Sequence, residues 1–370
     1  MTHWKVRYSP LPEQFADVDE VMKEIREHLV TCQFTLGPPV QQFERSFADV
    51  IGTRHAIGVG SGTDAIMLAL KAAGVQPGDE VITAANTFIA TVGAIHAAGA
   101  RPVLVDVTPS YNIDPRLIEA AITPRTRALV PVHYAGEPAE MAPIMAIAAR
   151  HGLPIVEDAC HAIQAHEHGR RAGTFGVAGC FSLHPLKNLN VWGDGGVITT
   201  DSDEIAGTLR LLRNHGLRSR DEVEILGHNS RLDSIQAIVG NWLIRQMDDI
   251  TATRIRYAAM YDRAFAAIAD SVTIPVRRPD VKSVYHLYMV TAERRDELYR
   301  YLHAQGVEAK IHYPIPLHLQ PALARFGYAR GDFPVTERLA GRLISLPLDQ
   351  HLTEDAVAYC AQTVLDFYRR

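Results

Sequence analysis

The apolar positions between residues 56 and 213 fall into short continuous runs that alternate with longer segments of helical spacing. Short apolar runs bounded by turn residues are typical of buried strands, whereas apolar residues spaced by a helical turn are typical of helices. Strands separated by helices of this length predict a mostly parallel sheet sandwiched by helices. We expect strands over 79–83, 101–107, 128–133 and 154–158, and helices over 88–98, 115–121 and 139–151.

The segments on either side of this alternation extend the same α/β unit. Ahead of it, residues 18–30 and 40–50 have helical spacing and predict helices in an N-terminal arm, interrupted by the glycine and prolines of 34–40. Beyond it, we expect a strand that ends at Phe181 and Ser182. An antiparallel return strand should follow over 195–200, and a helix over 204–213.

The last third of the chain has a different pattern, which predicts a smaller α+β domain. A long helix that runs past Ile244 leads into it, and we place the boundary in that helix. Residues 1–248 then form a large α/β domain with its N-terminal arm, and residues 249–370 form the small domain. Within the latter we expect strands over 273–276, 283–290 and 307–313, and helices over 296–305, 335–343 and 354–368.

Composition excludes several classes of function. The 370 residues carry a net charge of −5 with no dense basic block, so binding to nucleic acid or to an anionic membrane is not expected. No apolar run has the length of a membrane span and the start lacks a signal-peptide core, so we expect a cytoplasmic protein. The four cysteines form no paired motif and the histidines no HExxH pattern, so we expect neither a disulfide framework nor a metal.

A glycine-rich turn over 58–64 leads from a short strand into a strongly apolar helix. It lacks the third glycine of a dinucleotide fingerprint and the Gly-Lys-Ser/Thr of a P-loop. A helix start nevertheless exposes unpaired N–H groups and favours anions. We therefore expect one phosphate to be held by the amides of Gly62, Thr63 and Asp64 and by the Thr63 hydroxyl. A purely structural turn into a core helix is the alternative.

Asp158 ends an apolar run and should be largely buried, where an unpaired carboxylate is costly. A protonated pyridine nitrogen would satisfy it, because aspartate keeps such a ring protonated as an electron sink. A salt bridge to an arginine, or an N-cap of the next segment, would satisfy it equally well.

Lys187 lies between the apolar run 179–183 and the glycine-rich turn 192–196. Apolar surroundings lower the pKa of a lysine and make its amine nucleophilic, as Schiff-base formation requires. We hypothesise that Lys187 holds an aldehyde cofactor; a surface lysine in a loop is the other interpretation. The proline-rich loop 314–321 follows Tyr313 and contains His318. Such a stiff loop suits either a substrate wall or a structural link.

Taken in chain order, these motifs resemble the aspartate aminotransferase fold (pyridoxal-phosphate fold type I). In detail they resemble the sugar aminotransferase family called DegT/DnrJ/EryC1/StrS. The matching motifs span nearly the whole chain: 60–65 (Gly-Ser-Gly-Thr-Asp-Ala), 86–88 (Asn-Thr-Phe), 132–136 (Val-His-Tyr-Ala-Gly), 157–162 (Glu-Asp-Ala-Cys-His-Ala), 181–188 (Phe-Ser-Leu-His-Pro-Leu-Lys-Asn), 193–196 (Gly-Asp-Gly-Gly), 229–233 (Asn-Ser-Arg-Leu-Asp) and 312–318 (His-Tyr-Pro-Ile-Pro-Leu-His).

The resemblance implies a role for each matching residue. Lys187 would carry pyridoxal 5'-phosphate as a Schiff base and then move a proton between cofactor and substrate carbons. Asp158 would pair with the pyridine nitrogen, and Phe88 would stack on the ring. The remaining implied cofactor contacts are Gly62, Thr63 and Ser182 to the phosphate, His161 near the ring hydroxyl, where many members have glutamine, and Asn229 from the second subunit of a homodimer.

The implied reaction is a two-stage amino transfer from L-glutamate to a nucleotide-linked keto-sugar through pyridoxamine 5'-phosphate. Members with histidine in place of the lysine dehydrate sugars, and Lys187 is retained here. We expect the sugar to face His184, Tyr313 and His318. The motifs slightly favour amination at C3 over C4. Amination of another ketone such as a cyclitol, or a regulatory protein that binds the cofactor without turnover, are the alternatives.

Overall fold

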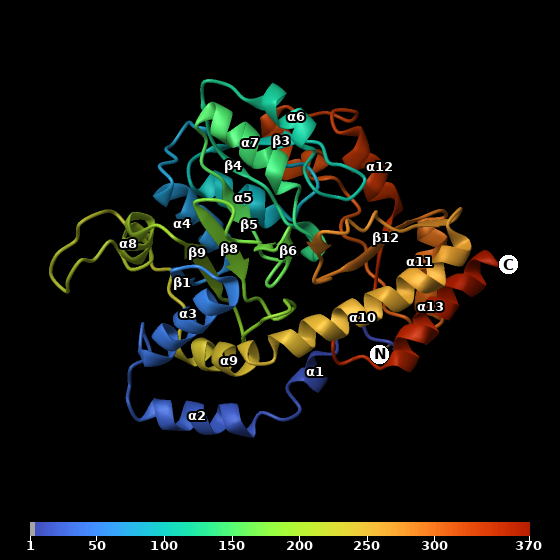
Figure 1. Cartoon of the computed structure of the whole chain (residues 1–370), viewed down its shortest axis with the longest axis horizontal. Helices are drawn as coiled ribbons and strands as arrows, with labels where there is room; N and C mark the ends of the chain where they lie inside the picture. Colours follow the sequence, from blue (N-terminus) through green and yellow to red (C-terminus); the bar gives the residue numbers. More distant parts are fainter. Residues whose placement is uncertain (1–3) are drawn as a thin grey trace.

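The computed structural model describes residues 4–370 and arranges them around a central sheet (Figure 1). Its strands form two groups, in the orders β1-β9-β8-β5 and β3-β2-β4, and the parallel bridges Leu129–Ile155 and Val132–Asp158 join β5 to the second group. Neighbours are parallel except at β9, which is antiparallel to β8 and β1. The strands are β1 (His55–Val59), β2 (Glu80–Ala84), β3 (Arg101–Val105), β4 (Thr126–Val130), β5 (Val156–Asp158), β8 (Ala178–Ser182) and β9 (Gly196–Thr200). The predicted mostly parallel sheet and its antiparallel return strand are confirmed.

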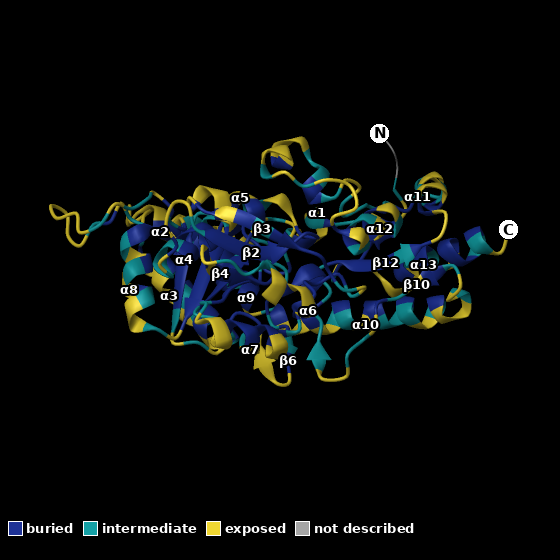
Figure 2. Cartoon of the chain, turned by 90° about the horizontal axis from the view of Figure 1, so that it is seen from above, coloured by how far each residue is buried: buried dark blue, intermediate teal, exposed yellow. Residues whose placement is uncertain are grey.

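Helices cover both faces of this sheet, because side chains alternate between the faces along each buried strand. On one face, Ile57 and Ile198 lie in the cluster that includes α4, α5 and α8. On the other, Phe181 and Val197 contact α3 and α9, and Ile82 lies with α7. Figure 2 shows the strands as the most buried part of the chain. These helices are α3 (Pro38–Ile51), α4 (Gly62–Ala72), α5 (Ile89–Ala97), α7 (Met141–His151), α8 (Asp203–Leu212) and α9 (Ser234–Ile244).

Shorter elements complete the large α/β part. The helix α2 lies along α9, against which Val21 and Ile25 are buried. A small sheet, β11-β6-β7, stands apart from the central one. Bounds of these elements are α1 (Leu11–Gln14), α2 (Asp19–Leu29), α6 (Pro115–Ile118), β6 (His166–Glu167), β7 (Arg170–Arg171) and β11 (Val281–Lys282).

The C-terminal part is a small antiparallel sheet, β10-β12-β13, packed with helices. The long helix expected past Ile244 is two helices, because α9 ends there and α10 begins at Met247. The break falls where the domain change was placed, and the boundary at residue 248 stays a prediction. The elements are α10 (Met247–Phe265), β10 (Val272–Thr273), β12 (Tyr288–Ala292), α11 (Arg295–Ala304), α12 (Pro334–Arg342), β13 (Leu343–Leu346) and α13 (Glu354–Tyr368).

The predicted strand over 307–313 is wrong. That segment makes only isolated bridges, Val6 with Val307 and Lys310 with Ser345. The place beside β12 is taken by β13, which follows α12 without a turn. A four-residue buried strand joined directly to a helix cannot be separated from it by periodicity, which explains why β13 was not predicted.

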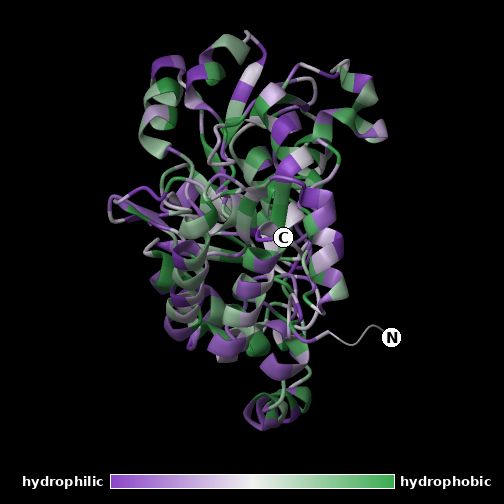
Figure 3. Cartoon of the chain, turned by 90° about the vertical axis from the view of Figure 1, so that its right-hand side faces the viewer, coloured by the Kyte–Doolittle hydropathy of each residue, from purple (hydrophilic) through white to green (hydrophobic). Residues whose placement is uncertain are grey.

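The outer helices carry hydrophilic residues among hydrophobic ones, as Figure 3 shows. This is the pattern of helices that bury one face and present the other to water. Within residues 4–370, no helix is both long enough and apolar enough to cross a membrane.

Candidate active site

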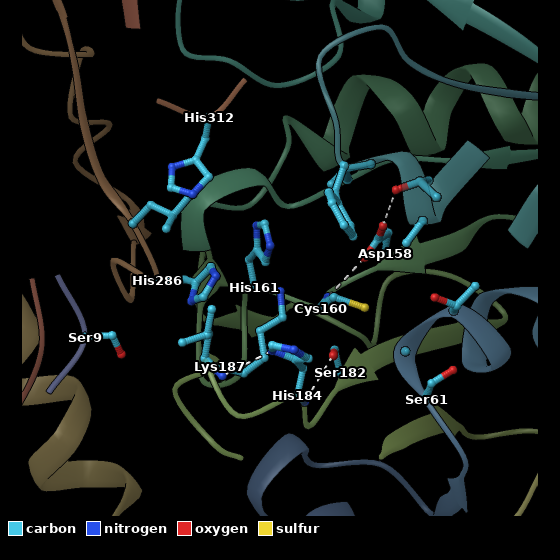
Figure 4. Close-up of a pocket in the computed structure, with 18 of the residues that line it drawn as sticks. Ser9, Ser61, Asp158, Cys160, His161, Ser182, His184, Lys187, His286 and His312 are labelled. Atoms are coloured by element: carbon cyan, nitrogen blue, oxygen red, sulfur yellow. Dashed lines mark hydrogen bonds between the residues drawn. The ribbon is translucent and has the colours of Figure 1, made fainter. Parts of the chain in front are cut away.

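A cavity of about 510 Å³ lies at the carboxyl ends of β5 and β8, where ligands of such sheets bind. Its walls come from the α4 start, the loop after β8, the N-terminal segment at Tyr8 and Ser9, and two segments of the C-terminal part, at His286 and at His312 (Figure 4). Most of the residues predicted for the site line it: Gly62, Thr63, Phe88, Asp158, His161, Ser182, His184, Lys187 and Tyr313.

Lys187 lines this cavity and is not a surface lysine. Its backbone N–H donates to the His184 carbonyl at 2.8 Å, and its own carbonyl accepts from Asn190 Nδ2 at 2.9 Å. The loop is therefore tied on both sides of the lysine. Burial lowers the pKa of the Lys187 amine below its usual value, although the nearby Cys160 and Asp158 act in the opposite direction. The amine is thus easier to deprotonate than that of a solvated lysine.

Asp158 ends β5 with its side chain 5% exposed. Its Oδ2 accepts from Thr91 Oγ1 at 2.7 Å, and its Oδ1 accepts from the Cys160 N–H at 3.2 Å. Among residues 4–370, no lysine or arginine forms a salt bridge with it. Because a carboxylate can accept about four hydrogen bonds, Asp158 retains acceptor capacity toward the cavity.

The start of α4 has the geometry expected of an anion cradle, with one difference from the prediction. Ser61 caps the helix, and its Oγ accepts from the Asp64 N–H at 3.0 Å, so this amide is not free for a phosphate. The amides of Gly62 and Thr63 precede the first helical bond, from the Ala65 N–H to the Ser61 carbonyl. They remain available to an anion.

Close packing requires glycine at the start of this cradle. A Cβ on Gly62 would lie 2.7 Å from Ser182 Cβ and 3.0 Å from Cys160 Sγ. The α4 start and the end of β8 therefore approach each other closely, which places Ser182 beside the Gly62 and Thr63 amides.

Phe88 stands just before α5 and is 47% exposed, which is unusual for an aromatic ring in a cavity wall. Its ring centroid lies 5.6 Å from that of Tyr313, at an angle of 33° between the planes. The two rings form one wall of the cavity.

Four of the described histidines line the cavity, and one of them, His184, lies beside Ser182, since its N–H donates to Ser182 Oγ at 3.3 Å. Sequence analysis identified His161 and His184 but missed His286 and His312. Burial and the Lys187 charge lower the pKa of His161 well below its usual value, and the same causes lower the pKa of His312 to about 4. At neutral pH these imidazoles are uncharged, so they can both donate and accept hydrogen bonds.

Two predicted residues do not line the cavity of this chain. His318 is 2% exposed, its Nε2 is 3.0 Å from Glu337 Oε1, and its ring packs on Phe333. It is a buried structural residue, which corrects its assignment to the substrate wall. Asn229 is exposed in the loop between α8 and α9, away from the cavity of its own chain.

Sequence reasoning also missed Tyr8, Ser9 and the pair Arg254–Asp349. Arg254 Nη2 donates to Asp349 Oδ2 at 2.9 Å, and both are buried. No local motif marks these residues, because they reach the cavity through contacts between segments distant in sequence. For His312, which was also missed, the sequence did offer a signal, because it adjoins Tyr313 in the motif 312–318.

The cavity residues fit the expected cofactor, pyridoxal 5'-phosphate. The glycine-dependent cradle suits its phosphate, the free acceptor capacity of Asp158 suits its ring nitrogen, and the amine of Lys187 suits its aldehyde. The part of the chain that the structure describes contains no cluster of three or more histidine, cysteine or acidic side chains arranged to hold a metal ion.

Comparisons with known proteins agree with this site. The model of the DegT/DnrJ/EryC1/StrS aminotransferase family matches residues 16–365. A pleiotropic regulatory protein of Geobacillus stearothermophilus is 43% identical over 97% of both chains. The dTDP-3-amino-3,4,6-trideoxy-α-D-glucose transaminase of Streptomyces venezuelae is also 43% identical, over 91% of both chains.

Solved aminotransferase structures are also similar to this chain in fold. S. venezuelae DesV in complex with a ketimine intermediate has a TM-score of 0.96, with 41% identity over 99% of both chains. NtdA from Bacillus subtilis with bound cofactor PMP has a TM-score of 0.93, with 31% identity over 99% of this chain and 86% of the other. The expected fold type is confirmed. The chain therefore belongs to the DegT/DnrJ/EryC1/StrS aminotransferase family, as an enzyme whose cofactor is pyridoxal 5'-phosphate.

Proposed function

We propose that this enzyme transfers the amino group of L-glutamate to a nucleotide-linked keto-sugar, at C3 rather than C4. The observation that carries the proposal is the convergence of Lys187, Asp158 and the α4 start on one cavity that leaves room beside them. The name of the S. venezuelae relative, a 3-amino sugar transaminase, supports both the substrate class and C3. Glutamate is the donor that the family resemblance implies.

Lys187 is the proposed base and acid. When bound, the cofactor supplies an electron sink for the substrate carbon that loses its proton. The Lys187 amine, deprotonated more easily because of its burial, accepts that proton and returns it. Thr91 and the Cys160 N–H hold Asp158 in position to keep the ring nitrogen protonated.

The remaining contacts position the two ligands. Gly62, Thr63 and Ser182 bind the phosphate, and Phe88 covers one face of the ring. His161 would donate from Nε2 to the ring hydroxyl, because its Nδ1 already accepts from the Ala135 N–H at 3.3 Å. On the open side of the cavity, His184 and Tyr313 contact the sugar.

The enzyme is proposed to act as a homodimer with shared sites. Asn229 lies next to Ser230, whose Oγ donates to Asp64 Oδ2 at 2.7 Å in the first turn of α4. The loop before it projects from the body of the molecule in Figure 1, and its Leu226 is 93% exposed. A projecting loop that exposes Val223 and Leu226 among its charged residues supports burial against a second copy, in which Asn229 would reach the phosphate of the partner's cofactor.

The test follows the cofactor absorbance during each half-reaction. Glutamate should remove the absorbance of the aldehyde form, and a keto-sugar should restore it, with ping-pong kinetics. Lys187→Ala should abolish both changes. Lys23→Ala, at a lysine whose side chain is 79% exposed, should leave them intact. Retained turnover in Lys187→Ala would contradict the mechanism.

A second candidate function is regulation without turnover, because one relative carries the name of a pleiotropic regulatory protein. The same experiment separates the two: an aldehyde-form absorbance that responds to no amino acid would favour regulation. A cyclitol ketone that restores the absorbance when no nucleotide sugar does would favour amination of another ketone.

A further inference from the structure

His286 belongs to a segment that is fixed from two directions. The Val284 N–H donates to the Gly136 carbonyl at 2.9 Å, and the Leu287 N–H donates to the Ala135 carbonyl at 3.2 Å. Tyr285, between them, has a φ of 47°, a conformation that non-glycine residues adopt at a cost. The surrounding contacts therefore hold the backbone of His286 in one place at the cavity wall.

Asn188 sets the orientation of the His286 ring. Its Nδ2 donates to the Val284 carbonyl at 3.1 Å, which turns its Oδ1 toward His286 Nδ1 at 3.4 Å. Since an amide oxygen only accepts, Nδ1 carries the ring proton. Among residues 4–370 no hydrogen bond reaches the other nitrogen, Nε2, so its lone pair is free, and His286 lines the cavity.

The groups around His286 keep this lone pair free. Its ring lies 4.3 Å from that of His161, at an angle of 36° between the planes, so the two rings are partly stacked (Figure 4). Burial, together with the groups His161, Lys187, Arg254 and His312 that face it, lowers the pKa of His286 well below its usual value. The imidazole is therefore neutral and can accept a hydrogen bond from a ligand.

A ligand in the cavity can supply the donor for this acceptor. The amino nitrogen of glutamate is the group that the cofactor takes up, so the carboxylates are the groups left to face His286; they offer only acceptors, and their interaction with the Nε2 lone pair is unfavourable. A ketone oxygen is likewise only an acceptor. A sugar hydroxyl beside the ketone is a donor, so His286 distinguishes the sugar from the amino acid.

We propose that His286 determines specificity in the sugar half-reaction, with its Nε2 accepting a hydrogen bond from a hydroxyl next to the carbon that is aminated. The assignment rests on the proposed function for the class of substrate. The proposed contact between His286 and the sugar is separate from the cofactor contacts and from the wall formed by Phe88 and Tyr313.

Two variants separate the two ring nitrogens. Glutamine in His286→Gln places a carboxamide oxygen near the position of Nε2, whereas asparagine in His286→Asn reaches only the position of Nδ1. We expect His286→Asn to raise KM for the keto-sugar about tenfold, the effect of one hydrogen bond, and His286→Gln to recover most of this loss. The glutamate half-reaction should change by a much smaller factor. His168→Asn, at an exposed histidine, is the control.

A deoxy substrate and a binding measurement complete the test. With a keto-sugar that lacks the neighbouring hydroxyl, wild type and His286→Asn should become equal. In calorimetric titrations of the pyridoxamine form with the aminated nucleotide sugar, His286→Asn should bind about tenfold more weakly. This readout needs no turnover, so it distinguishes a failure of the assignment from a failure of the proposed ketone substrate.

Three outcomes would overturn the assignment. Equal slowing of both half-reactions would mean that His286 acts through Lys187. Unchanged sugar affinity in His286→Asn would mean that Nε2 makes no contact. A lowered unfolding temperature, or failure of His286→Gln to recover activity with the hydroxylated sugar, would mean that the ring is structural.

Discussion

At the scale of single residues, burial decides the chemistry of Asp158 and Lys187. Asp158 stands at the end of β5 and Lys187 in the loop after β8, and both side chains line the cavity. The same Asp158 in water would be an ordinary solvated carboxylate, and here Thr91 and the Cys160 N–H hold it in one orientation.

Asp158→Asn should therefore lower kcat at least about 100-fold while leaving the fold intact. An amide cannot keep a pyridine nitrogen protonated, although it can still accept from Thr91. The measurement is single-turnover kinetics with glutamate, together with circular dichroism. The exposed Asp249, changed to asparagine, is the control. Comparable rates for Asp158→Asn and wild type would refute the proposed pairing.

Sequence analysis placed Asp158, Lys187 and Gly62 at one site only once the family resemblance joined their separate motifs. Asp158, Lys187 and the Gly62 turn each stand in a recognisable local context, and the structure brings them to one cavity. It did not predict His286, whose ring depends on Asn188, nearly a hundred positions away in the chain. It misplaced His318, because a proline-rich loop has no periodicity from which side-chain direction can be inferred.

At the scale of elements, the α4 start and the end of β8 must approach closely to form the cradle. Gly62→Ala should weaken cofactor binding, because the new Cβ would overlap Ser182 at 2.7 Å. A matched control is Gly207→Ala in α8, where an added Cβ meets no atom within 4 Å; there the change should raise stability slightly, by about 0.4–1 kcal/mol. Titration of the cofactor-free variants with pyridoxal 5'-phosphate measures the difference. Equal affinities would contradict the cradle.

Elements were predictable in proportion to their length and burial. The strands β2, β3 and β4 lie within three residues of their predicted bounds, because each is centred on a short apolar run between turns. The α9–α10 break and the strand β13 were not found. In both cases two elements follow each other almost without a linker, so the hydrophobic pattern carries no boundary.

At the scale of the whole molecule, buried neutral histidines predict sensitivity to acid. His161, His286 and His312 have pKa values below the ordinary 6.5, and that of His312 is about 4. The unfolded chain therefore binds protons at a higher pH than the folded chain, and stability is lost as the pH falls from 6.5 toward 4. The contribution of His312 alone is at most about 3.5 kcal/mol, since its pKa falls from 6.5 to about 4 and one pKa unit is worth about 1.4 kcal/mol.

Thermal unfolding between pH 7.5 and 4.5 measures this effect. The midpoint should fall with pH, and His312→Asn should fall less steeply, because asparagine does not titrate. A midpoint that stays constant down to pH 4.5 would show that these histidines are solvated.

The proposed dimer predicts complementation between two defective variants. A heterodimer of Lys187→Ala and Asn229→Ala chains has one site with both residues intact, if each site takes Lys187 from one chain and Asn229 from the other. Mixed, refolded chains should regain about a quarter of wild-type activity, the fraction of intact sites in a random mixture of two-fold dimers. Activity no greater than the mean of the two separate variants would mean that the sites are not shared.

The central claim is that the amino group ends on a nucleotide-linked sugar. The direct measurement is to incubate the enzyme with ¹⁵N-glutamate and a panel of 3-keto and 4-keto nucleotide sugars, and to locate the label by mass spectrometry and NMR. The account predicts ¹⁵N on C3 of a nucleotide sugar, and no labelled product with Lys187→Ala. Label on C4, or on no sugar while glutamate still converts the cofactor, would contradict it.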